Sequence, residues 1–385
     1  MLANAPDGPA LYRSLGIRPV INAAAALTVL GGSVMPPCVR DAMAKAAECF
    51  VDIDDLQAAV GKRIAELTHN EAALVVGGCA AGLAEITAAL MVGTDPYLIR
   101  RLPDTTALKN EVLIHRAHRN RYDQAVRTAG ARLVEFGLGY ETQPYELEGA
   151  ITDRAVAVLY AVAGFLPRGT LTLEETVAIA HRHALPVIVD AAAQLPPPEN
   201  LWRFTRDLGA DVAIFSGGKD LHGPQASGLV VGKQAIVDAV ALNGYPHHSI
   251  GRPMKIGKEN IVGALAAVEW YLSQDHDARL EDCERQVRQL QEILAGLPGV
   301  IVQRAWPGEA GEPLPRGLVV LEHGRCRLDR NELRAALRAG DPIVEVELAP
   351  DGIYVNPATL HPTEMELVAH RLSDLLSSIR DTIQA

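Results

Sequence analysis

The sequence has no excess of basic residues, no paired cysteines and no long apolar run. It contains 36 Lys and Arg against 47 Asp and Glu, a net charge of -11, which argues against a surface built to neutralise nucleic-acid phosphates. Five scattered cysteines without a CxxC pair predict no disulfide framework. No run is long enough to cross a bilayer, and the opening residues lack the basic and apolar regions of a signal peptide. We therefore expect a cytoplasmic protein that binds neither nucleic acid nor membrane.

The apolar residues gather in short runs that alternate with helical patterns. With 385 residues, 48% of them hydrophobic, the chain can bury a large core. Strands are predicted at residues 71–78, 110–115, 132–137, 155–162, 185–192, 210–216 and 227–232. These runs lack polar alternation, which is typical of strands buried on both faces, and Thr172 is placed to cap the helix before the fifth run. The pattern predicts an α/β fold with a mostly parallel sheet.

The chain after this pattern has a different organisation. Residues 257–294 predict a long helix or a helix pair, and shorter strands and helices follow, which together suggest a small α+β domain. We expect an N-terminal segment, 1–45, that packs on the small domain, a large domain, 46–258, and a third part, 259–385, made of the connecting helix and the small domain. No internal repeat or low-complexity linker is evident.

Two polar residues follow neighbouring predicted strands. Asp190 ends the run in "VIVDAAAQ", and Lys219 follows the next run in "FSGGKDLHGPQASG". The carboxyl ends of parallel strands face one crevice, and an amine beside a carboxylate there suits pyridoxal phosphate (PLP), whose aldehyde takes the amine and whose ring nitrogen takes the carboxylate. Ser216 and the glycine turn in "VGGCAAG" could hold the phosphate. Taken singly, a solvated loop lysine, a capping aspartate and a structural glycine turn are the ordinary alternatives.

Several motifs together resemble a known family of PLP enzymes. They are "VINAAAALTVLGGS", "FVDIDDLQAAVG", "GGCAAGL", "PDTTALKNEV", "VDAAAQ", "FSGGKDLHGPQASG" and "MKIGKENIVG". They resemble the selenocysteine-synthase-like family, related to L-seryl-tRNA selenium transferase, and most closely its branch containing D-glucosaminate-6-phosphate ammonia-lyase. The resemblance covers about residues 17–275. It implies fold type I, the aspartate-aminotransferase-like fold with a seven-stranded-type sheet, and an active site at the interface of a homodimer or higher homo-oligomer.

The resemblance also implies roles for individual residues. Lys219 would form the Schiff base with the cofactor, Asp190 would face the pyridine nitrogen, and His118, or alternatively His115, would stack on the ring. The other implied cofactor contacts are Ser216, Gly78, Cys79, Ala80, Ala81 and Ala192. No metal site is expected.

Candidate substrate contacts are less specific. The cations of "HHSIGRPMKIGKEN" form either a solvated face or an anion site, for which Arg252 and Lys258 are the candidates. Lys109 and Gln225 are further candidates, the latter across a dimer interface. The acidic Asp52, Asp54 and Asp55 suit a helix start better than a pocket. An arginine for the substrate carboxylate could be Arg316, Arg325 or Arg327.

The expected activity is that of a PLP-dependent ammonia-lyase. Lys219 would remove the Cα proton of a 2-amino-3-hydroxy acid such as D-glucosaminate 6-phosphate, and loss of the 3-hydroxyl would give a 2-keto-3-deoxy acid and ammonia. A racemase, aldolase or transferase shares the cofactor contacts. A selenium transferase would need a tRNA-binding domain that we do not find in this acidic chain, and a regulatory PLP-binding protein would not need an intact Lys219 and Asp190.

Overall fold

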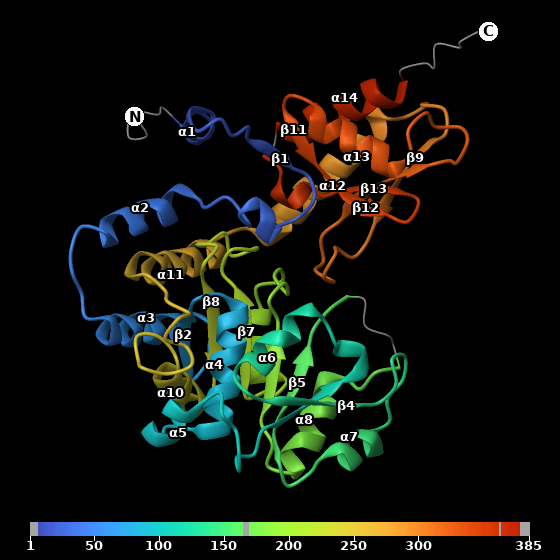
Figure 1. Cartoon of the computed structure of the whole chain (residues 1–385). Helices are drawn as coiled ribbons and strands as arrows, with labels where there is room; N and C mark the ends of the chain where they lie inside the picture. The colour runs from blue at the N-terminus through green and yellow to red at the C-terminus, as the bar shows by residue number, and fades with distance from the viewer. Residues whose placement is uncertain (1–6, 165–168, 362, 378–385) are drawn as a thin grey trace. The chain divides into compact units, whose positions relative to one another are not determined.

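The chain divides into two compact units in the computed structural model, which describes residues 7–164, 169–361 and 363–377 (Figure 1). The larger unit comprises residues 33–274 and 309–312, and the smaller comprises 1–32, 275–308 and 313–385. Residues 33–45 thus group with the larger unit by their contacts, and the predicted domain boundaries at 45 and 258 stay a prediction. In the described part of the chain, no helix has the length and apolarity that a membrane span requires.

A seven-stranded sheet forms the centre of the larger unit. Its strands are β2 (Ala72–Val76), β3 (Glu111–His115), β4 (Arg132–Phe136), β5 (Ala155–Ala161), β6 (Val187–Asp190), β7 (Val212–Ser216) and β8 (Gly228–Gly232). Their order is β2-β8-β7-β6-β5-β3-β4. Only β8 is antiparallel to its neighbours, and the other pairs are parallel. All seven predicted strands and the α/β fold class are confirmed.

Both faces of this sheet are buried under helices. Alternate strand residues enter two separate cores: Val187 and Val189 contribute to one, and Ile188 between them contributes to the other. This explains the continuous apolar runs. The helices of the unit are α2 (Pro37–Ala46), α3 (Ile53–Leu67), α4 (Cys79–Val92), α5 (Pro96–Arg101), α6 (Gln124–Thr128), α7 (Pro144–Ala150), α8 (Leu173–Arg182), α9 (Asn200–Trp202), α10 (Gln234–Asn243) and α11 (Lys258–Leu272).

Helix starts follow the predicted capping chemistry. The hydroxyl of Thr172 accepts a hydrogen bond from the amide of Glu175 at 3.1 Å, and the Glu175 carboxylate accepts from the amide of Thr172, so that the two form a capping box at α8. The carboxylate of Asp52 accepts from the amides of Asp54 and Asp55 at the start of α3. The acidic "DIDD" segment therefore serves as a helix start, as its alternative interpretation predicted.

The smaller unit combines a sheet with three principal helices. Its antiparallel sheet has the order β12-β13-β10-β9, and β1 pairs with β11 in parallel. The elements are α1 (Gly8–Ser14), β1 (Val20–Asn22), α12 (His276–Ile293), β9 (Val300–Ala305), β10 (Arg316–Leu321), α13 (Arg330–Ala339), β11 (Ile343–Glu345), β12 (Glu347–Ala349), β13 (Gly352–Val355) and α14 (Glu364–Ser377). The helical stretch after residue 257 is a pair, because α11 ends at Leu272 and Asp275 caps α12.

Candidate cofactor site

Two of the residues predicted to bind PLP, Asp190 and Ser216, lie at the carboxyl ends of neighbouring strands. Asp190 is the last residue of β6 and pairs with Ala161, the last residue of β5. Ser216 is the last residue of β7, and its amide donates to the carbonyl of Ala192 at 3.3 Å. Because β5, β6 and β7 are parallel, these residues meet at one edge of the sheet. We call it the carboxyl edge.

The lysine turn after β7 is shaped by close backbone contacts. A Cβ at Gly218 would lie 2.6 Å from Cα of Gln225, so only glycine fits there. The amide of Gly217 donates to the carbonyl of Ser227 at 2.9 Å, which closes the turn onto β8. Lys219, partly buried, projects from this closed turn. The turn therefore fixes the backbone that carries the amine.

Asp190 is a partly buried acid with few partners in the described structure. The amide of Ala192 donates to its Oδ1 at 3.1 Å. Burial raises the pKa of Asp190, and the Ala192 hydrogen bond and the charge of Lys219 act in the opposite direction. A protonated ring nitrogen facing this carboxylate would lower its pKa further, because a nearby cation favours the charged form. The site is thus electrostatically matched to a cationic group.

The thiol of Cys79 belongs to the same cluster. Burial raises its pKa far above the ordinary value, and the charge of Asp190 raises it further, whereas the charge of Lys219 lowers it. Electrostatic coupling to both residues means that the start of α4, Asp190 and Lys219 share one site. The thiol is neutral at physiological pH, so it is not a nucleophile there.

A phosphate cradle lies between α4 and β8. Gly78 precedes α4 with φ of 101° and provides no side-chain cap, so the first amides of the helix, at Cys79, Ala80 and Ala81, are available to an anion. A Cβ at Gly228 would lie 2.7 Å from the carbonyl carbon of Gly78. Gly228 also pairs with Ser216 across β7 and β8. The cradle, defined as residues 78–81, Ser216 and Gly228, therefore unites both predicted phosphate contacts.

His118 lies beside this edge. Its Nδ1 accepts a hydrogen bond from the amide of Ala161 at 3.3 Å, and Ala161 pairs with Asp190. Its Nε2 is buried and has no hydrogen-bond partner among the described residues. Burial lowers the pKa of His118 to about 3, with a further contribution from His115, whose ring stacks on it at 4.8 Å. His118 is a neutral ring with one donor available for a ligand, whereas His115 bonds to Thr142.

The predicted substrate cations are dispersed. Arg252 is exposed, and its guanidinium lies 5.4 Å from the ring centre of Tyr245. The carbonyl oxygen of Met254 would be 2.6 Å from a Cβ at Gly77, so this loop lies against the approach to the cradle. Lys258 instead donates to the carbonyl of Ala46 at the end of α2 and to its neighbour Glu259. Lys258 therefore makes a structural contact that joins the start of α11 to the end of α2.

Lys109 and Gln225 are both exposed. Lys109 precedes β3, so it lies at the amino edge of the sheet, opposite Asp190 and Lys219. The structure therefore does not bring Lys109 to the cofactor residues of its own chain. Gln225 lies in the lysine turn, with its Cα against Gly218.

The three carboxylate candidates lie in the smaller unit and differ in burial. Arg316 is buried, stacks on Tyr354 at 4.1 Å and donates from Nη1 to Glu347 at 2.8 Å, while its Nε has no partner in the part of the chain that the structure describes. Arg325 and Arg327 are exposed. Burial and a fixed geometry distinguish Arg316 from the other two.

Two supports of the lysine turn were missed by the sequence reasoning. The amide and hydroxyl of Ser33 both donate to the carbonyl of Gly218, at 2.9 and 3.1 Å. The Nδ1 of His222 bonds to the carbonyl of Val34 at 3.0 Å. Residues far apart in sequence make these contacts, and Ser33 could have been suspected only because it ends the quoted "VINAAAALTVLGGS" motif.

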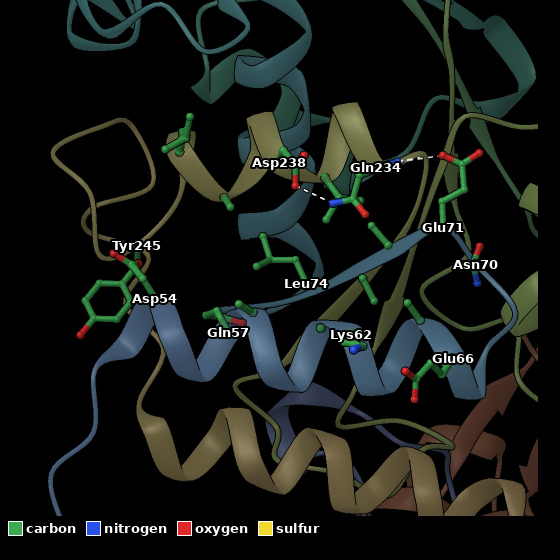
Figure 2. Close-up of a pocket in the computed structure, with 18 of the residues that line it drawn as sticks. Asp54, Gln57, Lys62, Glu66, Asn70, Glu71, Leu74, Gln234, Asp238 and Tyr245 are labelled. Atoms are coloured by element: carbon green, nitrogen blue, oxygen red, sulfur yellow. Dashed lines mark hydrogen bonds between the residues drawn. The ribbon is translucent and has the colours of Figure 1, made fainter.

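A cleft of about 750 Å³ lies away from these residues, between α3, β2 and α10 (Figure 2). Its floor is the outer edge of β2. The side-chain Nε2 of Gln57 donates to the carbonyl of Val75 at 2.7 Å, and Gly61 packs on the carbonyl of Ala73. The helix thus covers the free backbone groups of an edge strand. The cleft contains none of the cofactor residues, and its size alone does not make it the catalytic site.

The residues at the carboxyl edge fit PLP. Such a cofactor needs an amine, an acid, a helix start with available amides and a neutral ring, and the edge offers Lys219, the partly buried Asp190, the start of α4 and His118. Among the described residues, no cluster of His, Cys, Asp or Glu could hold a metal ion.

Comparisons with known proteins agree with this fit. The sequence profile of SelA, L-seryl-tRNA selenium transferase, matches residues 28–292. The chain is 34% identical to a 5'-C-glycyluridine monooxygenase-decarboxylase from a Streptomyces species, over 95% of this chain and 92% of that protein. It is 31% identical to the D-glucosaminate-6-phosphate ammonia lyase of Salmonella typhimurium, over 97% of this chain and 100% of that protein.

Solved structures extend the comparison to the fold. The structure of a D-glucosaminate-6-phosphate ammonia-lyase superposes with a TM-score of 0.84 at 30% identity, covering 96% of this chain and 99% of that chain. Aspartate aminotransferase from Thermotoga maritima shares the fold, with a TM-score of 0.53 at 19% identity over 98% of this chain and 99% of that one. The larger unit thus has the fold type I architecture, and the chain belongs to the SelA family of PLP-dependent enzymes.

Proposed function

We propose that this enzyme is an ammonia-lyase that acts on an anionic 2-amino-3-hydroxy acid of the D-glucosaminate 6-phosphate type. The observation that carries the proposal is the arrangement at the carboxyl edge, where Lys219 and Asp190 lie beside a phosphate cradle. The similarity to D-glucosaminate-6-phosphate ammonia-lyase over nearly the whole chain supports the substrate class.

The cofactor, when bound, supplies an aldehyde for an amine and a ring that accepts electrons from Cα. The chain's own residues then divide the remaining work. Lys219 Nζ takes the Cα proton and returns a proton to the departing 3-hydroxyl, so that water leaves as the C3–O bond breaks. Asp190 keeps the ring nitrogen protonated by charge. His118, neutral and buried, would lie against the ring, and its Nε2 would donate a hydrogen bond to the bound ligand. Hydrolysis of the released enamine gives ammonia and a 2-keto-3-deoxy acid.

The anionic end of the substrate is proposed to meet Arg252. Among the predicted cations, the Lys258 amine already donates hydrogen bonds to Ala46 and Glu259. The side chain of Arg252, in contrast, is exposed on a loop that lies near the cradle. Replacing Arg252 with Ala should raise KM for a phosphorylated substrate about tenfold, the effect of losing one charge-assisted contact. An unchanged KM would exclude Arg252 from this role.

A second candidate follows from the relative with 34% identity, whose name describes a monooxygenase-decarboxylase. Under this alternative, the same cofactor residues would act on a glycyl-nucleoside, and oxygen would be consumed with release of carbon dioxide. The two reactions have different co-substrates and products, so they can be separated directly.

The deciding experiment measures absorbance and products together. The purified protein with PLP should absorb as a lysine-bound cofactor, and Lys219→Ala should lose this band. Adding D-glucosaminate 6-phosphate should release ammonia and keto acid in equal amounts without oxygen uptake. Oxygen uptake with a glycyl-nucleoside would favour the second candidate, and a spectral shift without ammonia would favour a racemase or aldolase. Absence of the band after PLP addition would overturn the assignment of Lys219.

We also propose that the enzyme works as a homodimer or larger homo-oligomer in the cytoplasm. The fully exposed side chain of Phe50, at 102% of its reference area, and the 78% exposed Val34, whose carbonyl contacts His222 of the lysine turn, support an additional contact surface. The net charge of -11 supports a small-molecule substrate over tRNA. A monomeric mass in sedimentation would contradict the assembly.

A further inference from the structure

A buried glutamate on α4 has no role in the chemistry above. Glu85 lies in the helix that begins at the phosphate cradle, and it is only 2% exposed. In the described structure, no Lys, Arg or His forms an ion pair with it. Burial raises the pKa of Glu85 to about 8, and no charged neighbour contributes to this shift. An ionised carboxylate in such a place is costly, so the neutral acid is the form that fits the fold at neutral pH.

The carboxyl group of Glu85 contacts the loop formed by residues 244–255, which we call the basic loop. A Cβ at Gly251 would lie 2.5 Å from Glu85 Oε1, and a Cβ at Gly244 would lie 3.3 Å from the same atom. The amide of Gly251 donates to the carbonyl of Asn243 at 3.0 Å, and the Asn243 side chain donates to Gly93 at the end of α4. The Glu85 carboxyl group therefore contacts the basic loop at two points: at Gly244, where the loop begins, and at Gly251.

The far half of the basic loop reaches the cofactor site. The amide of Met254 donates to Gly251 at 2.9 Å, which connects the two halves. The carbonyl of Met254 lies against Gly77, next to the first residue of the cradle. Arg252 lies between these two points. A shift of the loop at Gly251 would thus be transmitted to the cradle and to Arg252.

The titratable groups around Glu85 leave its charge unopposed. The elements packed against α4 are α5, α6, α10 and strands β2, β5, β7 and β8, and β2, β7 and β8 carry no titratable side chain. Those on the remaining elements and on the basic loop are Tyr97, Arg100, Arg101, Arg127, Tyr160, Asp238, Tyr245, His247, His248, Arg252 and Lys255. Because none of them affects Glu85, ionisation would leave a buried negative charge that only solvent could stabilise.

We propose that neutral Glu85 is a positioning residue that seats the basic loop against the phosphate cradle, and that its ionisation releases the loop. The inference rests on the proposed cofactor site for its consequence, but not for its geometry. Release should weaken binding of the cofactor phosphate and of the anionic substrate together. The enzyme would then lose its ligands on the alkaline side of pH 8.

Loop release can be measured without activity by limited trypsin digestion. Lys255 is followed by Ile256 and can be cleaved, whereas Arg252 is followed by Pro253, which trypsin does not accept. Between pH 7 and pH 9.5, cleavage after Lys255 should increase about tenfold in the wild type, as expected for a group that titrates near the middle of this range. Glu85→Gln, neutral and of the same shape, should stay protected. Glu66→Gln, which removes an exposed carboxylate on α3, is the charge-matched control and should behave as the wild type does.

Binding of PLP to these proteins on a Lys219→Ala background removes the contribution of the lysine. The dissociation constant should rise about tenfold over the same pH interval when Glu85 is present, and less than twofold in the variant that also carries Glu85→Gln. Equal pH dependence with and without Glu85→Gln would overturn the proposal, and so would cleavage of Glu85→Gln at pH 7. If no variant binds PLP, the proposed function fails, while the digestion still decides the role of Glu85.

Discussion

The polar groups at the two edges of the seven-stranded sheet differ in how many partners they have within the protein. At the amino edge, Asp211 accepts hydrogen bonds from Lys233 at 2.6 Å and a backbone amide of β6 at 2.7 Å, and it lies 2.8 Å from His181. Burial raises the pKa of Asp211, but these partners outweigh burial and lower it. Glu111, 5% exposed, is similarly paired with Arg132.

At the carboxyl edge, the polar groups have few partners of their own. Asp190 has one backbone hydrogen bond and a raised pKa, and the Nε2 of His118 is buried without a partner. A protein satisfies its buried polar groups internally unless a ligand does so. The polar groups at the amino edge therefore have their partners within the protein, whereas those at the carboxyl edge would be satisfied by the proposed cofactor. Polar groups with few partners among the described residues thus distinguish the proposed functional edge from the other one.

The contrast between the edges predicts different outcomes for the two aspartates. Asp190→Asn should lower kcat/KM by at least about 100-fold, because an amide cannot hold a ring nitrogen protonated. Asp211→Asn should leave turnover unchanged and lower the free energy of unfolding by about 2 kcal/mol, because its charged hydrogen bonds are lost. Steady-state ammonia release and urea unfolding of both variants would show whether the two aspartates differ in this way, and similar behaviour would remove the contrast.

A smaller effect is expected from the backbone of the cradle. In Gly228→Ala, the new methyl group would meet Gly78 at 2.7 Å and push the start of α4 away from Ser216. The dissociation constant of PLP should rise about tenfold, or 1.4 kcal/mol. The matched control is Gly139→Ala, where nothing lies within 4 Å of the added atom. Fluorescence titration should give the wild-type constant for this control, and a similar loss in both variants would contradict the cradle.

The mildest change concerns acid stability. The pKa of His118 falls from 6.5 to about 3 on folding, so the unfolded chain binds a proton between these values that the folded chain does not. Stability should therefore decrease as pH falls below 6.5. Between pH 7 and about pH 5.5, the wild type should lose about 1 kcal/mol more than His118→Gln in urea unfolding. His183→Gln, at an exposed position after α8, should match the wild type.

The sequence was sufficient for the large sheet but not for the smaller unit. Strands such as β3 and β5 were predictable because both of their faces are buried, so that their residues form a continuous apolar run in the sequence. The three-residue strands β1, β11 and β12 were not predicted, because three residues carry no measurable periodicity. The reversed direction of β8 was also not evident, since an apolar run is the same in either orientation.

In the candidate site, too, local sequence patterns predicted some residues and could not predict others. Asp190 and Lys219 could be paired because each follows a strand, and strand ends converge. Lys109 was a further candidate for a substrate contact, yet it precedes its strand and so lies at the other edge. The contacts of Ser33 with Gly218 and of Met254 with Gly77 join distant segments, and no local pattern encodes them.

The hairpin from β7 to β8 carries both the lysine and part of the cradle. Ser216 and Gly228 are opposite each other at the end of the strands next to the turn, and the amide of Gly217 donates to the carbonyl of Ser227 within the turn. The amine and the phosphate contact are thus mounted on one hydrogen-bonded piece of chain. In hydrogen exchange, these amides should open as a single cooperative unit. The enzyme would then retain or release the two ends of its cofactor in one event.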